Sequence, residues 1–156
     1  MSVRRVCLIV TSAAVCLIVT FAAVVMVLKC SERSESHYSN LDDAKLRGDL
    51  DKGWIPAVLP NNAEHIREIH DIDTNETWGV FQVRSNGIKF PNHCMAGTER
   101  LTIFSPRVSW WPEYLTGEVR PEKLSAEREV KVVDCRGTAP VIFFLEPQGR
   151  VFFWTP

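Results

Sequence analysis

The densest group of side chains able to do chemistry lies in HDIDTNETWG, residues His70 to Gly79. Asp71, Asp73 and Asn75 alternate like the first three ligands of a helix–loop–helix calcium site. Such a loop also needs glycine at its sixth position and glutamate at its twelfth, and these places hold Glu76 and Gln82. The stretch therefore does not predict calcium binding.

Other catalytic and metal-binding patterns are equally weak. The sequence has no nucleophile elbow, no glycine-rich phosphate loop and no zinc-spaced set of cysteines and histidines. His65 and His70 would lie on opposite faces of a strand, without a third ligand nearby. We predict no catalytic residue, no metal and no cofactor. The alternative is an enzyme whose site is assembled from scattered residues such as His70, Asp71 and Asp73.

The same stretch has the composition of a turn between two strands. Asp and Asn bond their own backbone and tolerate left-handed conformations, which suits a turn near Asp73 to Thr77. Flanking strands are predicted from about Ile66 to Ile72 and from Trp78 to about Arg84. The spacing of three between isoleucines leaves a helix before the turn as the alternative. In the hairpin, Asp73 or Asn75 should bond the turn backbone, and His70 should pack beside Trp78 or be hydrogen-bonded.

Aromatic residues gather in SWWPEYLTG, which is typical of a short helical turn with Pro112 at its first position and Gly117 as its terminator. Trp110, Trp111 and Tyr114 are interpreted mainly as core and rim residues. An aromatic pair beside proline also suits a sugar or a peptide. These three residues are the predicted contact surface.

The remaining elements follow from caps, periodicity and turn chemistry. A helix is predicted up to Lys52, with Asn40 or Ser39 as its N-cap and Gly53 as its terminator, although Gly48 weakens it. Strands are predicted at Leu101–Phe104 and Arg128–Cys135, and a hairpin in PVIFFLEPQGRVFFW around Glu146 to Gly149. Trp54, Ile55, Val58 and Leu59 are predicted core residues.

The N-terminal part predicts a membrane anchor. Residues 1–5 form a short basic tail, and Val6 to Leu28 is a run of 23 residues without a charge. About 20 apolar residues span a bilayer, whereas the apolar core of a cleaved signal peptide usually has about 7–15. Cleavage after Thr20-Phe21-Ala22 is the alternative. The polar segment 29–39 is predicted to be a flexible tether.

Two basic residues precede the run, Arg4 and Arg5, and two follow it, Lys29 and Arg33, so their number does not fix its orientation in the membrane. The order of a short basic tail, an apolar run and then a folded domain favours export of the C-terminal domain.

The five cysteines divide between the two parts of the chain. Cys7 and Cys16 suit an apolar helix, and Cys30 follows a lysine, which does not suit lipid attachment. In an exported domain, Cys94 and Cys135 are expected to form a disulfide, with Cys30 as the competing partner. Residues 37–156 carry 14 basic and 17 acidic side chains, a net charge of −3 without long blocks of either sign. This balance argues against nucleic-acid binding.

The segment GWIPAVLPNNAEHIREIHDIDTNETWGVFQV resembles small bacterial membrane-anchored proteins and lipoproteins that carry a YbbD-like head domain. The resemblance rests on Gly53, Trp54, Pro56, Leu59, Pro60, Ala63, Ile66, His70, Asp71, Asp73, Thr74, Asn75 and Phe81, with Trp110, Trp111, Pro112 and the final aromatic run further on. It implies an exported head domain of unknown activity, to which no catalytic residue can be transferred.

Together these observations predict an α+β fold: one N-terminal transmembrane helix, then a small domain at 40–156 with an antiparallel sheet and one or two short helices. The expected protein crosses the inner membrane once through residues 6–28 and exposes its C-terminal domain on the periplasmic side. Its predicted role is non-enzymatic binding of an envelope protein, peptide or glycan. A periplasmic immunity-type protein is a further alternative.

Overall fold

The computed structural model describes residues 19–20, 33–83, 88–136 and 140–156. The chain divides into two units, residues 1–33 and 34–156. Val19 and Thr20 are helical, and the rest of the predicted anchor at 6–28 lies outside the described residues, as do the tail at 1–5 and residues 29–32. None of the helices within the described ranges is long and apolar enough to span a membrane.

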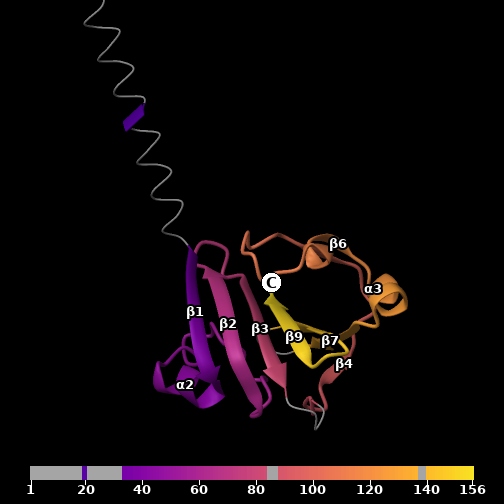
Figure 1. Ribbon diagram of the computed structural model, residues 1–156, viewed down its shortest axis with the longest axis horizontal. Helices are drawn as coiled ribbons and strands as arrows, with labels where there is room; N and C mark the ends of the chain where they lie inside the picture. Colours follow the sequence, from indigo (N-terminus) through magenta and orange to yellow (C-terminus); the bar gives the residue numbers. More distant parts are fainter. Residues whose placement is uncertain (1–18, 21–32, 84–87, 137–139) are drawn as a thin grey trace, which may run out of the picture. The chain divides into compact units, whose positions relative to one another are not determined.

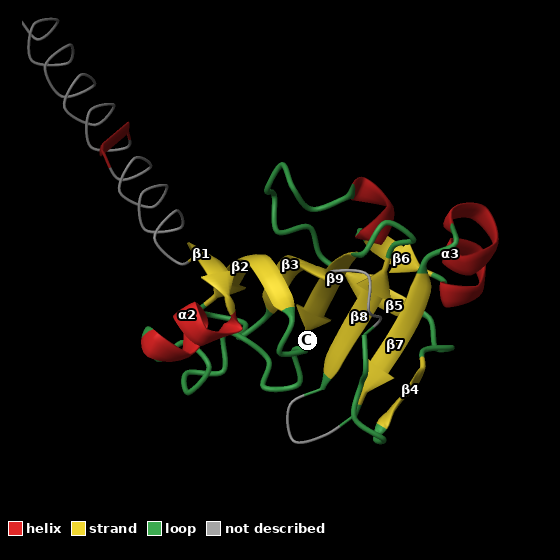
Figure 2. Ribbon diagram, turned by 60° about the horizontal axis from the view of Figure 1, so that its bottom comes forward, coloured by secondary structure: helices red, strands yellow, loops and turns green. Residues whose placement is uncertain are grey.

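The second unit is an α+β domain, as predicted, and its main sheet runs in the order β1-β2-β3-β9-β8-β7-β4 (Figures 1 and 2). Its strands are β1 (Arg33–Asn40), β2 (Ala63–Asp71), β3 (Thr77–Val83), β4 (Cys94–Ala96), β7 (Lys131–Cys135), β8 (Val141–Leu145) and β9 (Arg150–Thr155). β5 (Leu101–Ile103) and β6 (Gly117–Val119) form a separate antiparallel pair. The helices of this unit are α2 (Leu41–Leu46), the 3-10 helix η1 (Glu113–Leu115) and α3 (Pro121–Arg128).

Both faces of the main sheet are covered, which explains why VIFFL and VFFW are continuous apolar runs rather than alternating ones. One face packs against the segment from β5 to α3 through Trp78, Val80, Val132, Ile142, Phe144, Phe152 and Trp154. The other packs against the segment from α2 to β2 through Ile66, Phe81, Phe143, Val151 and Phe153. We call these the first and the second face. Of the predicted core residues, Ile55 and Leu59 are buried, while Trp54 and Val58 are only partly buried.

The predicted hairpin around HDIDTNETWG is confirmed: β2 and β3 pair antiparallel, with Ile69 opposite Trp78. Asn75 takes the left-handed conformation, with φ +58°. The prediction that Asp73 or Asn75 bonds the turn backbone is wrong. The acceptor is Asp71, whose Oδ1 accepts hydrogen bonds from the amides of Asp73 (3.1 Å) and Thr74 (3.3 Å). Ile72 was expected on the apolar side, but it lies in the turn and is exposed.

Two predictions about the start of the domain are wrong. Arg33–Ser39, expected to be tether, belongs to β1, whose mostly polar sequence buries only Tyr38. The helix capped by Asn40 ends at Leu46 instead of Lys52, because Gly48 takes a left-handed conformation (φ +76°) and turns follow it. Asn40 does cap the helix, since its side chain accepts from the amide of Asp43 at 3.0 Å.

The C-terminal elements agree with the sequence except at α3. β8 and β9 form the predicted hairpin, with Gly149 at φ +81° in its turn. The strand predicted from Arg128 begins only at Lys131, because Arg128 is the last residue of α3. The predicted strand at Leu101–Phe104 ends at Ile103. The helical turn predicted after Pro112 is present as η1.

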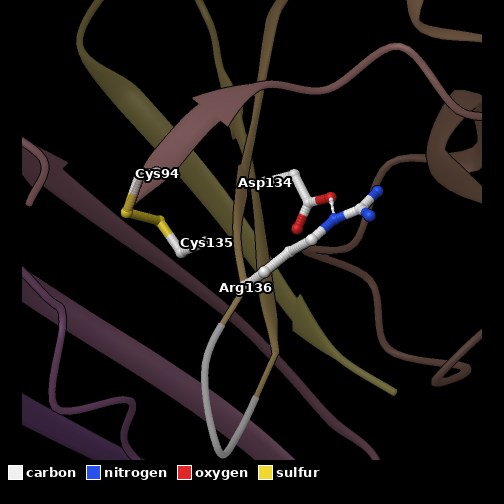
Figure 3. The surroundings of a disulfide bond; sticks show 4 residues. All are labelled: Cys94, Asp134, Cys135 and Arg136. Carbon is white, nitrogen blue, oxygen red and sulfur yellow. Dashed lines mark hydrogen bonds and ion pairs between the residues drawn. A yellow bond between two sulfur atoms is a disulfide. The ribbon is translucent and has the colours of Figure 1, made fainter. Parts of the chain in front are cut away.

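Cys94 and Cys135 face each other across β4 and β7, with their sulfur atoms 2.08 Å apart (Figure 3). The pairing expected from the sequence is therefore the one that the fold brings together. Asp134 and Arg136 lie beside it, and the guanidinium Nε of Arg136 donates to Asp134 at 2.7 Å. The bond fastens β4, which is three residues long, to the edge of the sheet.

Candidate binding site

A pocket of about 380 Å³ opens on the first face of the sheet, above β2, β3 and β9. The pairing register of the three strands brings the floor residues of the pocket together. Arg67 lies opposite Val80, and Val80 lies opposite Phe152. A second row places Gln82 opposite Arg150. Residues far apart in the sequence therefore meet on one surface, where buried apolar side chains such as Val80 and Phe152 lie beneath exposed polar ones such as Gln82.

A β-bulge shapes one side of the pocket. The register of β2 against β3 shifts between Glu64 and Arg67. Within the shift, His65 takes a left-handed conformation with φ +53°, which is uncommon for a residue other than glycine. Bulges of this kind redirect side chains and occur frequently beside functional sites. His65 is exposed and lines the pocket.

The wall of the pocket is the segment Ser109–Pro112, which precedes η1. Trp111 is the fixed part of this wall: its ring meets that of Phe152 edge to face at 5.7 Å, and its Nε1 donates to the Leu115 carbonyl at 3.3 Å. Trp110 is partly exposed and stands at 74° to Trp111. Trp111 is buried, so Trp110 is the part of this aromatic wall that solvent reaches.

Glu35 of β1 holds the exposed indole in place. Its Oε1 accepts from Trp110 Nε1 and from Arg67 Nη2, both at 2.8 Å. The Arg67 guanidinium also lies over the Trp110 ring, 5.4 Å from its centre. Burial alone would raise the pKa of Glu35, but the hydrogen bonds from Arg67 and Trp110 hold that pKa below its usual range. The charged carboxylate thus fixes two pocket residues at once.

Arg150 is fixed in a similar way on the other side of the floor. Its Nε donates to Glu146 at 2.6 Å, and its guanidinium lies 5.2 Å above the Phe152 ring. Tyr114 donates to the same Glu146 carboxylate. Both pocket arginines are therefore held by acids that lie outside the pocket lining.

The chemistry offered to a ligand is that of hydrogen-bond donors around aromatic rings. Among the described residues, the lining contains no carboxylate. Arg67 Nε is buried and has no hydrogen-bond partner within the described part of the chain. A buried donor without an acceptor costs about 1–3 kcal/mol. Arg67 Nε is itself closed to solvent, so the groups open to a ligand are the exposed side chains of the lining, among them His65, Gln82 and Ser109.

The structure brings together two of the three predicted contact residues. Trp110 and Trp111 line the pocket, whereas Tyr114 does not and contacts it only through Glu146. The sequence reasoning missed Arg67, Gln82 and Arg150, which lie on strands that the sequence did identify. These three residues are brought to the pocket by the pairing register of β2, β3 and β9, which depends on the tertiary fold and cannot be read from the local sequence.

A second polar cluster lies on the other side of β2 and is closed to substrates. Glu68 is completely buried, and His70 Nδ1 lies 3.2 Å from its carboxylate. Trp54 stacks on the His70 ring at 3.9 Å and 15°. Tyr38 and Lys52 each donate to Asp49 at 2.8 Å. His70 is therefore hydrogen-bonded, one of its two expected environments, but its aromatic neighbour is Trp54 rather than Trp78.

Burial decides the charges in this cluster. Desolvation raises the pKa of Glu68 to about 8, with the nearby charge of Asp49 adding to the effect. Burial also lowers the pKa of His70. Asp49 stays ionised, because Lys52 and Tyr38 hold its pKa below the usual range although burial opposes them. At neutral pH the Glu68–His70 pair is therefore largely uncharged.

The three residues named for the alternative enzyme hypothesis, His70, Asp71 and Asp73, do not come together in one site. His70 is buried under Trp54, Asp71 binds the turn backbone, and Asp73 is exposed. Among the described residues, no three acidic, histidine or cysteine side chains are grouped to hold a metal. The geometry of these three residues thus gives the enzyme reading no support.

Comparison with known proteins gives a family match in the same region of the chain. Residues 32–82 match the model of the YbbD head domain. No curated protein and no solved structure gives a significant match. The matched range contains Arg67 of the pocket, Glu35 that binds it from outside the lining, and the whole Glu68–His70 cluster. The match over residues 32–82 is consistent with a YbbD-like head domain, the family that the sequence motif resembles.

Proposed function

We propose that this protein is a membrane-anchored bacterial envelope protein whose domain after residue 33 binds a ligand without catalysing a reaction. The uncharged run at residues 6–28 supports the anchor, and the short basic tail before it supports export of the domain. The partner would then be an envelope component on the periplasmic side of the inner membrane.

One observation supports the binding role. In the pocket above β2, β3 and β9, which we call the Trp110 pocket, hydrogen bonds fix the lining side chains in position while the rim stays open to solvent. Glu35 fixes Trp110 and Arg67, and Glu146 fixes Arg150. Such preorganisation lowers the entropy lost when a ligand binds. Concave aromatic sites with a few placed polar groups are the usual form of small-ligand pockets.

Site-specific photocrosslinking tests this role in the complete chain. A photoreactive residue replaces Ser109, which is exposed and lines the pocket, or Leu46, which is 90% exposed on α2 and outside the pocket lining. In intact cells we expect a discrete adduct from position 109 that Trp110→Ala abolishes, and none from position 46. Equal labelling at both positions, or an adduct that persists in Trp110→Ala, would refute the pocket as the binding site.

A further inference from the structure

We infer that the segment from Phe104 to Arg107, which follows β5, rests on the surface of the bilayer and places the Phe104 ring among the lipid headgroups. This inference rests on the membrane anchor of the proposed function and adds which end of the domain meets the lipid. It follows from the short link after the apolar run, from the end of the domain at which β1 begins, and from the side chains exposed there.

The link between the apolar run and the domain is short. The run ends at Leu28 and β1 begins at Arg33, so only residues 29–32 lie between them in the sequence. A chain spans at most about 3.6 Å per residue, so the Cα atoms of Leu28 and Arg33 are at most about 18 Å apart. The headgroup layer of one leaflet takes up roughly 5–7 Å of that distance. An anchored chain therefore holds the start of β1 close to the membrane surface.

Two segments lie at the end of the domain where β1 begins (Figure 1). One is the loop from β5 to η1, whose Trp110 donates from Nε1 to Glu35 of β1 at 2.8 Å. This bond fastens the loop two residues after the start of the strand. The other is the turn between β2 and β3. The short link therefore keeps both segments near the membrane surface.

Both segments expose a large apolar side chain. Phe104 is 67% exposed, and Ile72, in the β2–β3 turn, is 59% exposed. Single exposed apolar residues are common on protein surfaces and would bind lipid only weakly in a free domain. A short link raises the effective concentration of the domain at the membrane to the millimolar range, so that a weak contact is enough to orient it.

The polar groups beside Phe104 suit a phospholipid phosphate. Arg107 has φ +58°, and its amide donates to Ser105 Oγ at 3.1 Å, so its side chain is presented by a defined turn. The side chain is exposed, and its guanidinium has no ion pair within the described part of the chain. Guanidinium groups bind phosphate oxygens strongly. Asp73 is exposed in the β2–β3 turn and would oppose a highly anionic surface, so the contact expected is with the phosphates of single lipids.

Fluorescence quenching by lipid tests this contact in the complete chain. A fluorescent dansyl amino acid replaces Phe104 or, as the matched control, Leu46, which is 90% exposed on α2 beyond the other end of β1. Each variant is reconstituted into phosphatidylcholine vesicles whose acyl chains are brominated near the headgroup. Quenching at position 104 should be at least about threefold greater than at position 46, because only a probe buried at the interface meets the bromine.

Two further changes should reduce the quenching at position 104. Arg107→Glu should lower it at least about twofold, because a carboxylate is repelled by lipid phosphate. Lys131→Glu, at an exposed site on β7, is the matched control and should leave it unchanged. A flexible insert of about 20 Gly and Ser residues before Arg33 leaves the domain unaltered and should also lower the quenching at least about twofold, because the effective concentration falls as the link lengthens.

Flotation of the same vesicles separates failure of this inference from failure of the proposed anchor. A chain that does not float with the vesicles would overturn both. A chain that floats but is quenched equally at positions 104 and 46 would overturn the lipid contact alone. Quenching at position 104 that is unchanged by Arg107→Glu and by the insert would overturn it as well.

Discussion

At the scale of single residues, the uncharged Glu68–His70 pair should set the dependence of stability on pH. The folded pKa of Glu68 is raised to about 8 from 4.5, so its contribution favours the folded state at low pH and is lost as the pH rises toward 8. The pKa of His70 is lowered, so its contribution is present above 6.5 and is lost as the pH falls below that value. Between pH 4.5 and 6.5 the two groups change the unfolding free energy in opposite directions. Above pH 6.5 the contribution of Glu68 dominates.

Glu68→Gln should therefore flatten the stability profile between pH 6.5 and 8. The unmodified chain should lose stability in this interval by up to about 1.4 kcal/mol per pH unit. Urea unfolding at a series of pH values measures both profiles. A steady rise of stability from pH 6.5 to 8 in the unmodified chain would show that Glu68 is ionised in the folded state at little cost.

The turn that ends β2 gives a second prediction at this scale. Asp71 accepts hydrogen bonds from two turn amides, those of Asp73 and Thr74, whereas the side chain of Asp73 is exposed. Asp71→Ala should thus cost about 1 kcal/mol of unfolding free energy, comparable to the loss of a helix cap, and Asp73→Ala only a few tenths. Equal losses in the two variants, measured by denaturant unfolding, would contradict this assignment of the turn.

At the scale of elements, the strength of the local signal decided what the sequence could predict. The β2–β3 and β8–β9 hairpins were predictable because apolar strands flank turn residues, Asn75 and Gly149, that tolerate positive φ. β1 was not, because RSESHYSN is polar and is held as a strand by tertiary contacts such as Glu35 to Arg67. Its formation depends on the rest of the sheet.

The helix α3 was missed for a related reason. Its sequence buries only Pro121 and Leu124, so it lacks the apolar stripe from which a helix is recognised. Pro121 at its first position and the left-handed Glu129 after its end are the local marks that were present. The pocket was predictable only at Trp110 and Trp111, because its arginines depend on which strands become neighbours.

The edge strand β4 should depend on its disulfide. Cys94 and Cys135 are 41 positions apart, and a bridge across such a loop is worth roughly 3–4 kcal/mol in the chain-entropy model. The double replacement by serine should lower the unfolding free energy by about this amount. Peptide mapping of the exported protein without reductant should find the two cysteines linked. Two free thiols, or a bridge from Cys30, would contradict the pairing.

At the scale of the whole molecule, the anchor is a prediction from sequence alone. The chain should resist alkaline-carbonate extraction, and protease added to spheroplasts should digest the domain after residue 33. Protection of that domain would reverse the proposed orientation. A soluble product beginning near Ala23 would show that the apolar run is a cleaved signal peptide.

The central claim is that this domain binds its ligand at Trp110 and Trp111, and the five tryptophans of the chain provide the most direct measurement. Each has one indole N–H, so each gives its own signal in a nitrogen–proton correlation spectrum of the complete chain in micelles. On titration with a solubilised envelope extract, the account predicts that the Trp110 and Trp111 signals shift and saturate together, while Trp54, Trp78 and Trp154 stay in place. Shifts confined to those three tryptophans, or no shift at all, would contradict it.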